Sequence, residues 1–237
     1  MDIKNQIEFY DKYWSGRKVL NNLKLRRAVK ILDYFIAVKR EIKEPRIIEL
    51  GSGDGRFTAF IGEFGNADAI ELSKEAVIRA NELYPHVNYI HGNAIDHPLE
   101  QATYDVVISQ EVIEHIEEQD KYFEACYNIL KPGGYLILTT PNKKVFDHME
   151  GGNWSRQPIE KVLTPNDLKQ LVKKKFKIID YDSIILNFGK QGYFKLINNR
   201  YLTGFCNKVG LRKFRERTLG KFGYGLHQCI FAKKNMI

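Results

Sequence analysis

The chain has 237 residues, of which 43% are hydrophobic and 12% aromatic, enough for the core of one large domain. No stretch approaches the roughly 18 apolar residues of a membrane-spanning helix, and the first residues form no apolar signal region, so we expect a cytoplasmic protein. Cys126, Cys206 and Cys229 are far apart and in no metal-binding pattern, which favours free thiols over structural zinc.

Helical periodicity predicts helices over residues 3–14 and 19–40, and strands and helices alternate after Pro45. The predicted strands are 46–50, 67–72, 87–90, 104–109, 135–140, 176–187 and 226–233. The predicted helices between them are 55–64, 74–83, 119–130 and one that begins at Thr164, with a turn over 131–134. This alternation predicts an α/β fold in which helices cover both faces of a mostly parallel sheet. A ligand should bind at the carboxyl ends of the first strands.

The first predicted strand runs into a glycine-rich loop. Glu49 lies near the end of the strand, and Gly51, Ser52, Gly53 and Gly55 follow it. Glycines at every second position let the backbone take positive φ and approach a ligand closely. A dinucleotide-binding loop has the spacing G-x-G-x-x-G, in which the third glycine comes one residue later.

The charges of this loop indicate the kind of ligand. Arg56 stands where a dinucleotide-binding loop has glycine or alanine, and Glu49 and Asp54 would repel a diphosphate. The same carboxylates suit a ligand that carries a sulfonium and an α-ammonium group. The sequence therefore predicts a site for S-adenosyl-L-methionine at this loop.

Two further pairs of residues complete the expected cofactor site. Glu71 and Leu72 end the second strand, where a carboxylate can accept both ribose hydroxyls; the alternative is a solvated carboxylate at a strand end. Asn93 and Ala94 follow the third strand, where the amide side chain and the next backbone N–H can bind an adenine edge. The alternative for Asn93 is an Asx turn.

Gln110, Glu114 and His115 leave the fourth strand at the same edge of the sheet. We expect Gln110 to line the methionine end of the cofactor. His115, with Glu114 beside it, is the candidate general base, because a neutral imidazole takes a proton near pH 7. A histidine packed under the sheet edge is an equally open interpretation.

The N-terminal helix carries Tyr10, Tyr13 and Trp14, with Arg17 after it. It is expected to fold over the cofactor and to bring Tyr13 or Arg17 near the methionine carboxylate, although plain packing against the sheet explains the same residues. The acceptor should enter through the long loop after the fifth strand. That loop contains Trp154, Arg156 and Gln157.

Five stretches of the chain resemble the class I S-adenosylmethionine-dependent methyltransferases. They are residues 47–55, 70–73, 92–99, 104–116 and 130–142. Within that superfamily, residues 111–115 and 130–134 look like the ubiquinone-biosynthesis O-methyltransferase group and bacterial small-molecule or glycan methyltransferases. The resemblance implies a Rossmann-like three-layer sandwich with a seven-stranded sheet and an antiparallel last strand. It also implies S-adenosyl-L-homocysteine as the product.

Some relatives with a Glu-x-x-Glu-His stretch, including small-RNA 2′-O-methyltransferases, use it with a further histidine to hold a divalent metal. Here Glu111, Glu114 and His115 form the stretch, but Gln157 stands where the fourth ligand is expected. Glutamine is a weak ligand for a hard cation, so we expect no metal. His148 is the one nearby histidine that would replace it.

The formal net charge of +8 is concentrated in residues 189–224, which hold nine basic side chains and one acidic one. Aromatic residues are interleaved with the basic ones. We expect a single methyltransferase domain over 1–237. Its parts are an N-terminal helical cap (1–44), a cofactor-binding core (45–188 and 225–237) and a basic aromatic lid (189–224). The lid suits an anionic acceptor, a nucleic acid or a membrane surface, and a solvated helix pair is the plainer alternative.

The sequence favours O-methylation of a small-molecule or sugar hydroxyl, and the basic lid favours a phosphorylated or carboxylated acceptor. The alternative enzyme is an RNA methyltransferase, which the basic segment supports although no separate RNA-binding module is evident. A non-catalytic cofactor-binding protein is a third hypothesis, disfavoured by the intact glycine loop. The glycine spacing also disfavours a nicotinamide-dependent dehydrogenase.

Overall fold

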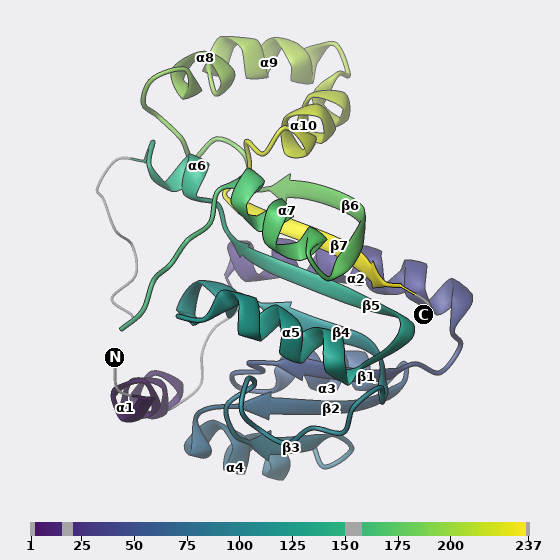
Figure 1. Cartoon of the computed structure of the whole chain (residues 1–237). Helices are drawn as coiled ribbons and strands as arrows, with labels where there is room; N and C mark the ends of the chain where they lie inside the picture. The colour runs from purple at the N-terminus through teal and green to yellow at the C-terminus, as the bar shows by residue number, and fades with distance from the viewer. Residues whose placement is uncertain (1–2, 16–20, 150–157, 236–237) are drawn as a thin grey trace.

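A computed structural model describes residues 3–15, 21–149 and 158–235 of the chain. In this part, seven strands form one sheet in the order β3-β2-β1-β4-β5-β7-β6 (Figure 1). The strands are β1 (Arg46–Leu50), β2 (Asn66–Glu71), β3 (Asn88–His91), β4 (Tyr104–Gln110), β5 (Leu130–Pro141), β6 (Phe176–Ile184) and β7 (His227–Lys234). Only β7 runs antiparallel to its neighbours, β5 and β6, among the described strands. The predicted fold class is confirmed.

Helices cover both faces of the sheet (Figure 1). The larger ones are α1 (Ile3–Trp14), α2 (Asn22–Glu41), α3 (Arg56–Gly62), α4 (Lys74–Leu83), α5 (Gln119–Ile129) and α7 (Pro165–Lys173). One face packs on α5 and α7, and the other on α2, α3 and α4. In β4, Val107 belongs to the first core and Val106 and Ile108 to the second, because successive side chains of a strand point to opposite faces. Cys126 and Cys229 are free thiols buried in these cores.

The helix signals in the sequence act as predicted. The Ser73 side chain accepts a hydrogen bond from the Ala76 amide and starts α4. Thr164 caps α7 in the same way, with Pro165 at the first helical position. The turn expected over residues 131–134 differs: the strand already begins at Leu130, which pairs with Tyr104 ahead of a register shift. A proline and two glycines therefore mark an irregular strand start here.

The segment between β6 and β7 forms three helices, α8 (Phe194–Ile197), α9 (Arg200–Lys208) and α10 (Arg212–Lys221), which we call the helical lobe. The lobe projects beyond the β6–β7 edge of the sheet (Figure 1). Its root is anchored by Phe194, which is buried in a small core with Val145, Ile185 and Leu226. Val145 lies on α6 (Lys143–Phe146), which follows β5.

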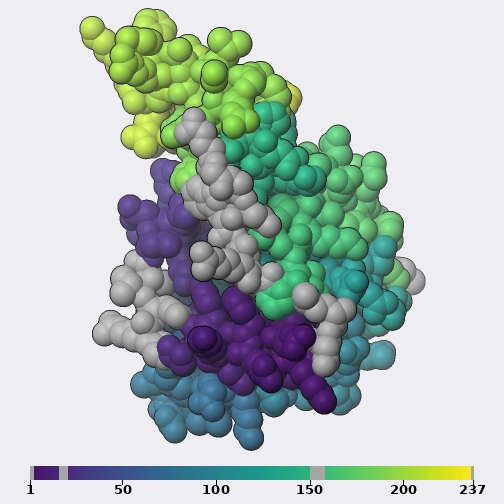
Figure 2. Space-filling view, turned by 90° about the vertical axis from the view of Figure 1, so that its left-hand side faces the viewer, coloured from purple at the N-terminus to yellow at the C-terminus, as the bar shows by residue number. Residues whose placement is uncertain are grey.

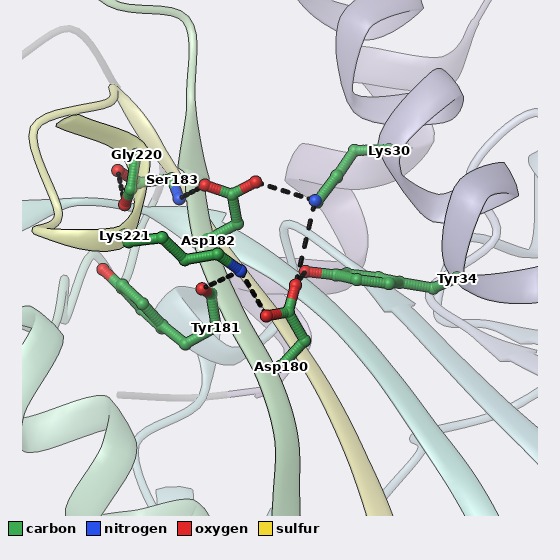
Figure 3. A network of polar contacts seen from close by, with 8 residues as sticks. All are labelled: Lys30, Tyr34, Asp180, Tyr181, Asp182, Ser183, Gly220 and Lys221. Carbon is green, nitrogen blue, oxygen red and sulfur yellow. Dashed lines mark hydrogen bonds and ion pairs between the residues drawn. The ribbon is translucent and has the colours of Figure 1, made fainter. Parts of the chain in front are cut away.

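A polar network ties the base of the lobe to the sheet and to α2 (Figure 3). Lys30 of α2 binds Asp182 at 2.7 Å, and the Tyr34 hydroxyl donates to Asp180 at 3.0 Å. Lys221, at the end of α10, pairs with the same Asp180. Because these groups come from α2, β6 and α10, the network fixes where the lobe leaves the sheet.

Asn142, which follows β5, is fully buried and connects two chain segments. Its amide nitrogen donates to the carbonyls of Gly223 and Gly225, at 3.0 and 2.8 Å, and its oxygen accepts from the Lys144 amide. Asn142 therefore holds the return of the chain from the lobe to β7 against the end of β5.

Asn142→Ala should leave two buried carbonyls without donors and lower the free energy of unfolding by about 3 kcal/mol. Urea unfolding followed by circular dichroism measures this loss. Asn207→Ala, at an exposed position of α9, is the matched control and should stay within about 0.5 kcal/mol of the wild type. Equal stability of the two variants would contradict this role for Asn142.

Candidate active site

The carboxyl ends of β1, β2 and β4 lie at one edge of the sheet, and α1 lies against the loops that follow them. The Ser73 hydroxyl donates to Asp11 of α1 at 2.6 Å, and the Gln6 amide donates to the carbonyl of His115 at 3.1 Å. These contacts place α1 between the loop after β2 and the 3₁₀ turn η1 (Ile113–His115) after β4. The helix therefore covers the edge at which the sequence predicts the site.

The glycine loop has the conformation that its sequence requires. Gly51 and Gly53 have φ of 74° and 56°, values that side chains with a Cβ rarely adopt. A Cβ at Gly51 would lie 2.5 Å from Val112, and one at Gly53 would lie 2.4 Å from the Trp14 ring of α1. The loop backbone is therefore in close contact with both α1 and the segment after β4. The Ser52 hydroxyl between the two glycines is buried and has no hydrogen-bond partner among the described residues.

Glu49 is buried at the base of this loop. It accepts hydrogen bonds from the Thr58 hydroxyl and from the Gln110 amide, the latter at 2.6 Å. Burial raises the pKa of Glu49 to about 7, against the opposing effect of these two hydrogen bonds. The contact also places Gln110, at the end of β4, next to Glu49 of β1.

Glu71, at the end of β2, connects the glycine loop to the next strand. One carboxylate oxygen accepts the Gly53 amide at 2.8 Å, and the other accepts the Ser73 amide at 3.0 Å. Burial raises the pKa of Glu71, opposed by these backbone hydrogen bonds. Leu72 lies between Glu71 and Ser73 in this turn. Asp54 of the loop is paired with the cation Arg56. Glu49 and Glu71, by contrast, accept hydrogen bonds from neutral donors.

Asn93 forms an Asx turn, the alternative that the sequence left open. Its side-chain oxygen accepts from the Ile95 amide at 2.9 Å, and its amide donates to Asp96 at 3.0 Å. The preceding Gly92 amide donates to the carbonyl of Glu71 at 3.0 Å, which places this turn beside the end of β2. Asn93 and Ala94 therefore lie at the predicted edge, with the Asn93 side chain engaged locally.

His115 lies in η1, mostly buried. Its Nδ1 is 2.8 Å from the carbonyl oxygen of Ile159, and a carbonyl only accepts, so Nδ1 carries the proton and Nε2 is the basic nitrogen. Nε2 is 3.7 Å from a carboxyl oxygen of Glu114. Burial lowers the pKa of His115, and it raises the pKa of Glu114 with help from the negative charge of Glu111. Both shifts favour the neutral form of the side chain.

Glu111 joins a charged cluster that the sequence did not reveal. Its carboxylate is 2.8 Å from Nδ1 of His227, at the start of β7, and 3.5 Å from Arg27 of α2. Burial alone would raise the pKa of Glu111, but these two neighbours hold it at about 2. Glu111 also has a φ of 55°, which is uncommon for a residue with a side chain. Because Arg27 and His227 are far from Glu111 in sequence, only the sheet topology could bring the three together.

Of the remaining predicted residues, Tyr13 and His148 are described and four others lie outside the described residues. Tyr13 is partly exposed and packs on Phe9 and Trp14. His148 lies at the root of the lobe, with its ring against Tyr193 and Phe194. Arg17, Trp154, Arg156 and Gln157 are outside the described residues. In the part of the chain that is described, no group of three His, Cys, Asp or Glu side chains is arranged to hold a metal ion.

Part of the chain is similar in sequence to known methyltransferases. Residues 48–138 match the family model of a methyltransferase domain. A Mycolicibacterium smegmatis protein named as a probable S-adenosylmethionine-dependent methyltransferase is 32% identical over 101 residues, 42% of this chain and 39% of that protein. The ubiquinone biosynthesis O-methyltransferase of Shewanella pealeana is 29% identical over 139 residues, 56% of this chain and 57% of that enzyme. The chain thus aligns with less than two thirds of either relative.

Solved structures show the same fold across nearly the whole chain. The N-methyltransferase NodS of Bradyrhizobium japonicum, solved with S-adenosyl-L-homocysteine, has a TM-score of 0.64 at 12% identity and covers 98% of both chains. The [4+2]-cyclase SpnF has a TM-score of 0.63 at 15% identity and covers 94% of this chain and 85% of its own. The second example shows that the fold alone does not fix the reaction.

Glu111→Gln should remove the carboxylate from between Arg27 and His227 and lower the free energy of unfolding by about 3 kcal/mol at neutral pH. The folded-state pKa of Glu111 lies below the ordinary value of about 4.3. Its stabilisation is therefore complete above that ordinary value and is lost as the pH falls toward 2.

Urea unfolding of both proteins at neutral and acidic pH measures this difference, which should shrink as the solution is acidified. Glu118→Gln, which removes an exposed carboxylate that pairs with Lys121, is the control and should change stability by less than about 1 kcal/mol. A Glu111→Gln protein as stable as the control at neutral pH would show that the cluster contributes little.

Proposed function

We propose that this chain, which carries a class I S-adenosylmethionine-dependent methyltransferase domain, transfers the methyl group of that cofactor to a hydroxyl of a small molecule or sugar. The observation that carries the proposal is a pair of buried carboxylates, Glu49 and Glu71, around a loop of positive-φ glycines. Hydrogen bonds from Thr58, Gln110 and backbone amides hold both carboxylates in place. A cationic ligand supplies the charge that these partners lack.

The residue types at this edge of the sheet suit the chemical groups of the cofactor. Glu71 would accept the ribose hydroxyls with lone pairs that its two backbone donors leave available. The buried hydroxyl of Ser52 has hydrogen-bonding capacity that the described residues do not use. The remaining proposed contacts come from Gly51, Gly53 and Gly55 of the loop, Leu72, Asn93 and Ala94 on the adenine side, and Gln110 and Tyr13 at the methionine end. The cofactor supplies an activated methyl group on a positively charged sulfur.

His115 is the proposed general base. Since Nδ1 donates to the Ile159 carbonyl, the free lone pair is on Nε2, where it can accept the proton of an acceptor hydroxyl. A charged Glu114 would favour the imidazolium form of His115. The raised pKa of Glu114 favours its neutral form instead, and burial lowers the pKa of His115, so both shifts favour an unprotonated imidazole. The chain's other task is to align the acceptor and exclude water, and α1 is placed to contribute to this.

His115→Asn should lower kcat by roughly 10²- to 10⁴-fold and leave the affinity for S-adenosylhomocysteine unchanged, because the proton acceptor is lost while the cofactor contacts remain. Turnover is measured with methyl-labelled cofactor on a panel of hydroxylated metabolites and nucleotide-linked sugars. His86→Asn, at an exposed position, is the control. Undiminished turnover in His115→Asn would remove His115 from the mechanism. Absence of methyl transfer to every hydroxylated acceptor would overturn the proposed reaction.

Cofactor affinity should depend on pH through Glu49. The pKa of this carboxyl is about 7 in the free protein, and a cationic ligand lowers it because it favours the ionised form. Binding of S-adenosylmethionine should therefore release protons, and affinity should rise by up to roughly tenfold per pH unit as the pH increases toward 7, and level off above it.

Calorimetry in buffers of different ionisation enthalpy measures the protons released. S-adenosylhomocysteine, which lacks the sulfonium charge, should release fewer protons, and Glu49→Gln should abolish the pH dependence. Equal proton release for both ligands would mean that Glu49 does not respond to the sulfonium.

A further inference from the structure

The helical lobe exposes an unusual amount of apolar surface. Among its described residues, α9 buries none and α10 buries only Gly220. Leu196, Tyr201, Phe205 and Phe214 are each at least 60% exposed. The other exposed apolar side chains of this region are Tyr193, Leu202, Val209, Leu211 and Phe222. This number of exposed apolar side chains on one projecting element indicates an interaction surface.

The same surface is strongly basic. Residues 189–224 hold nine basic side chains and one acidic one, Glu216, which is already paired with Arg212 at 2.9 Å. Exposed cations alternate along the lobe with the apolar residues, namely Lys195, Arg200, Lys208, Arg212, Lys213, Arg217 and Lys221. The partner of this surface must therefore offer negative charge and apolar volume together.

An apolar pocket of about 340 Å³ opens between the helices of the lobe. Ile197, Leu202, Cys206, Leu211 and Phe214 line it, and Arg215 is the charged residue in its wall. This pocket lies within the lobe and not at the glycine loop. A hydrocarbon chain fits such a lining, whereas a phosphate backbone or a sugar finds few polar partners there.

We propose that the helical lobe binds the surface of an anionic lipid bilayer. Its aromatic and aliphatic side chains enter the interface between headgroups and acyl chains, and its cations lie at the anionic headgroups. The exposed aliphatic residues favour a bilayer over a nucleic acid, since leucine and valine gain nothing from phosphate or from stacking. This binding goes beyond the proposed methyl transfer and does not depend on it.

The position of the lobe suits this role. α1 and the lobe occupy separate parts of the face in Figure 2, with the lobe as the outermost element. Anchorage through Phe194 and through the Lys221–Asp180 pair fixes the base of the lobe on the sheet. The lobe can therefore enter a bilayer surface while the glycine loop stays in water.

The test is co-sedimentation of the full chain with phosphatidylcholine vesicles that contain or lack phosphatidylglycerol, at low and high salt. The expected result is binding to the anionic vesicles that weakens with salt and is absent with phosphatidylcholine alone. Phe205→Ser with Phe214→Ser should weaken binding at least roughly tenfold, and so should Arg212→Gln with Lys213→Gln and Arg217→Gln.

Matched controls change exposed residues outside the lobe. Ile78→Ser with Leu83→Ser on α4 and Arg26→Gln with Lys74→Gln and Lys173→Gln should bind as the wild type does. Unchanged S-adenosylhomocysteine affinity in every variant shows that the proteins are folded. No binding to anionic vesicles, or equal binding by lobe and control variants, would overturn the proposal. So would salt-dependent binding of tRNA that survives Phe205→Ser with Phe214→Ser and exceeds vesicle binding, because the surface would then recognise nucleic acid.

Discussion

The arrangement of the site depends on two carboxylates that the fold buries at the carboxyl edge of its parallel strands. Glu49 and Glu71 come from neighbouring strands, and Glu71 binds the backbone of the glycine loop that leaves β1. Among the described residues both carboxylates have neutral hydrogen-bond donors as partners, and these offset only part of the free-energy cost of burial. A site with two such carboxylates favours a ligand that carries positive charge. The glycine loop, α1 and Gln110 all lie around this pair.

The two glutamates that follow β4 lie in different electrostatic environments. Glu111 and Glu114 are three residues apart, yet their environments shift their pKa values in opposite directions. Arg27 and His227 lower the pKa of Glu111, while burial beside that charge raises the pKa of Glu114. Two carboxyl groups whose pKa values are shifted apart are a common feature of catalytic sites. His115 lies beside this pair, between α1 and the end of β4, and burial lowers its pKa.

Much of the fold follows from local signals in the sequence, because those signals are themselves local physics. The first strand, the cap at Ser73 and the cap at Thr164 were predicted where the structure has them. The glycine loop and Glu71 were found because strand ends and turn residues are readable from spacing. The cluster of Arg27, Glu111 and His227 was missed, since its members meet only through the crossover that inserts β7 beside β5. Local sequence also could not choose between an Asx turn and a ligand role for Asn93, because both use the same oxygen.

We propose that the site at the glycine loop binds a cationic sulfonium ligand in preference to a pyrophosphate. Competition calorimetry of the wild-type chain with S-adenosylmethionine and with a nicotinamide dinucleotide tests it most directly. The expected result is saturable heat with S-adenosylmethionine that the dinucleotide does not displace. Saturable heat with the dinucleotide, and none with S-adenosylmethionine or S-adenosylhomocysteine, would contradict it.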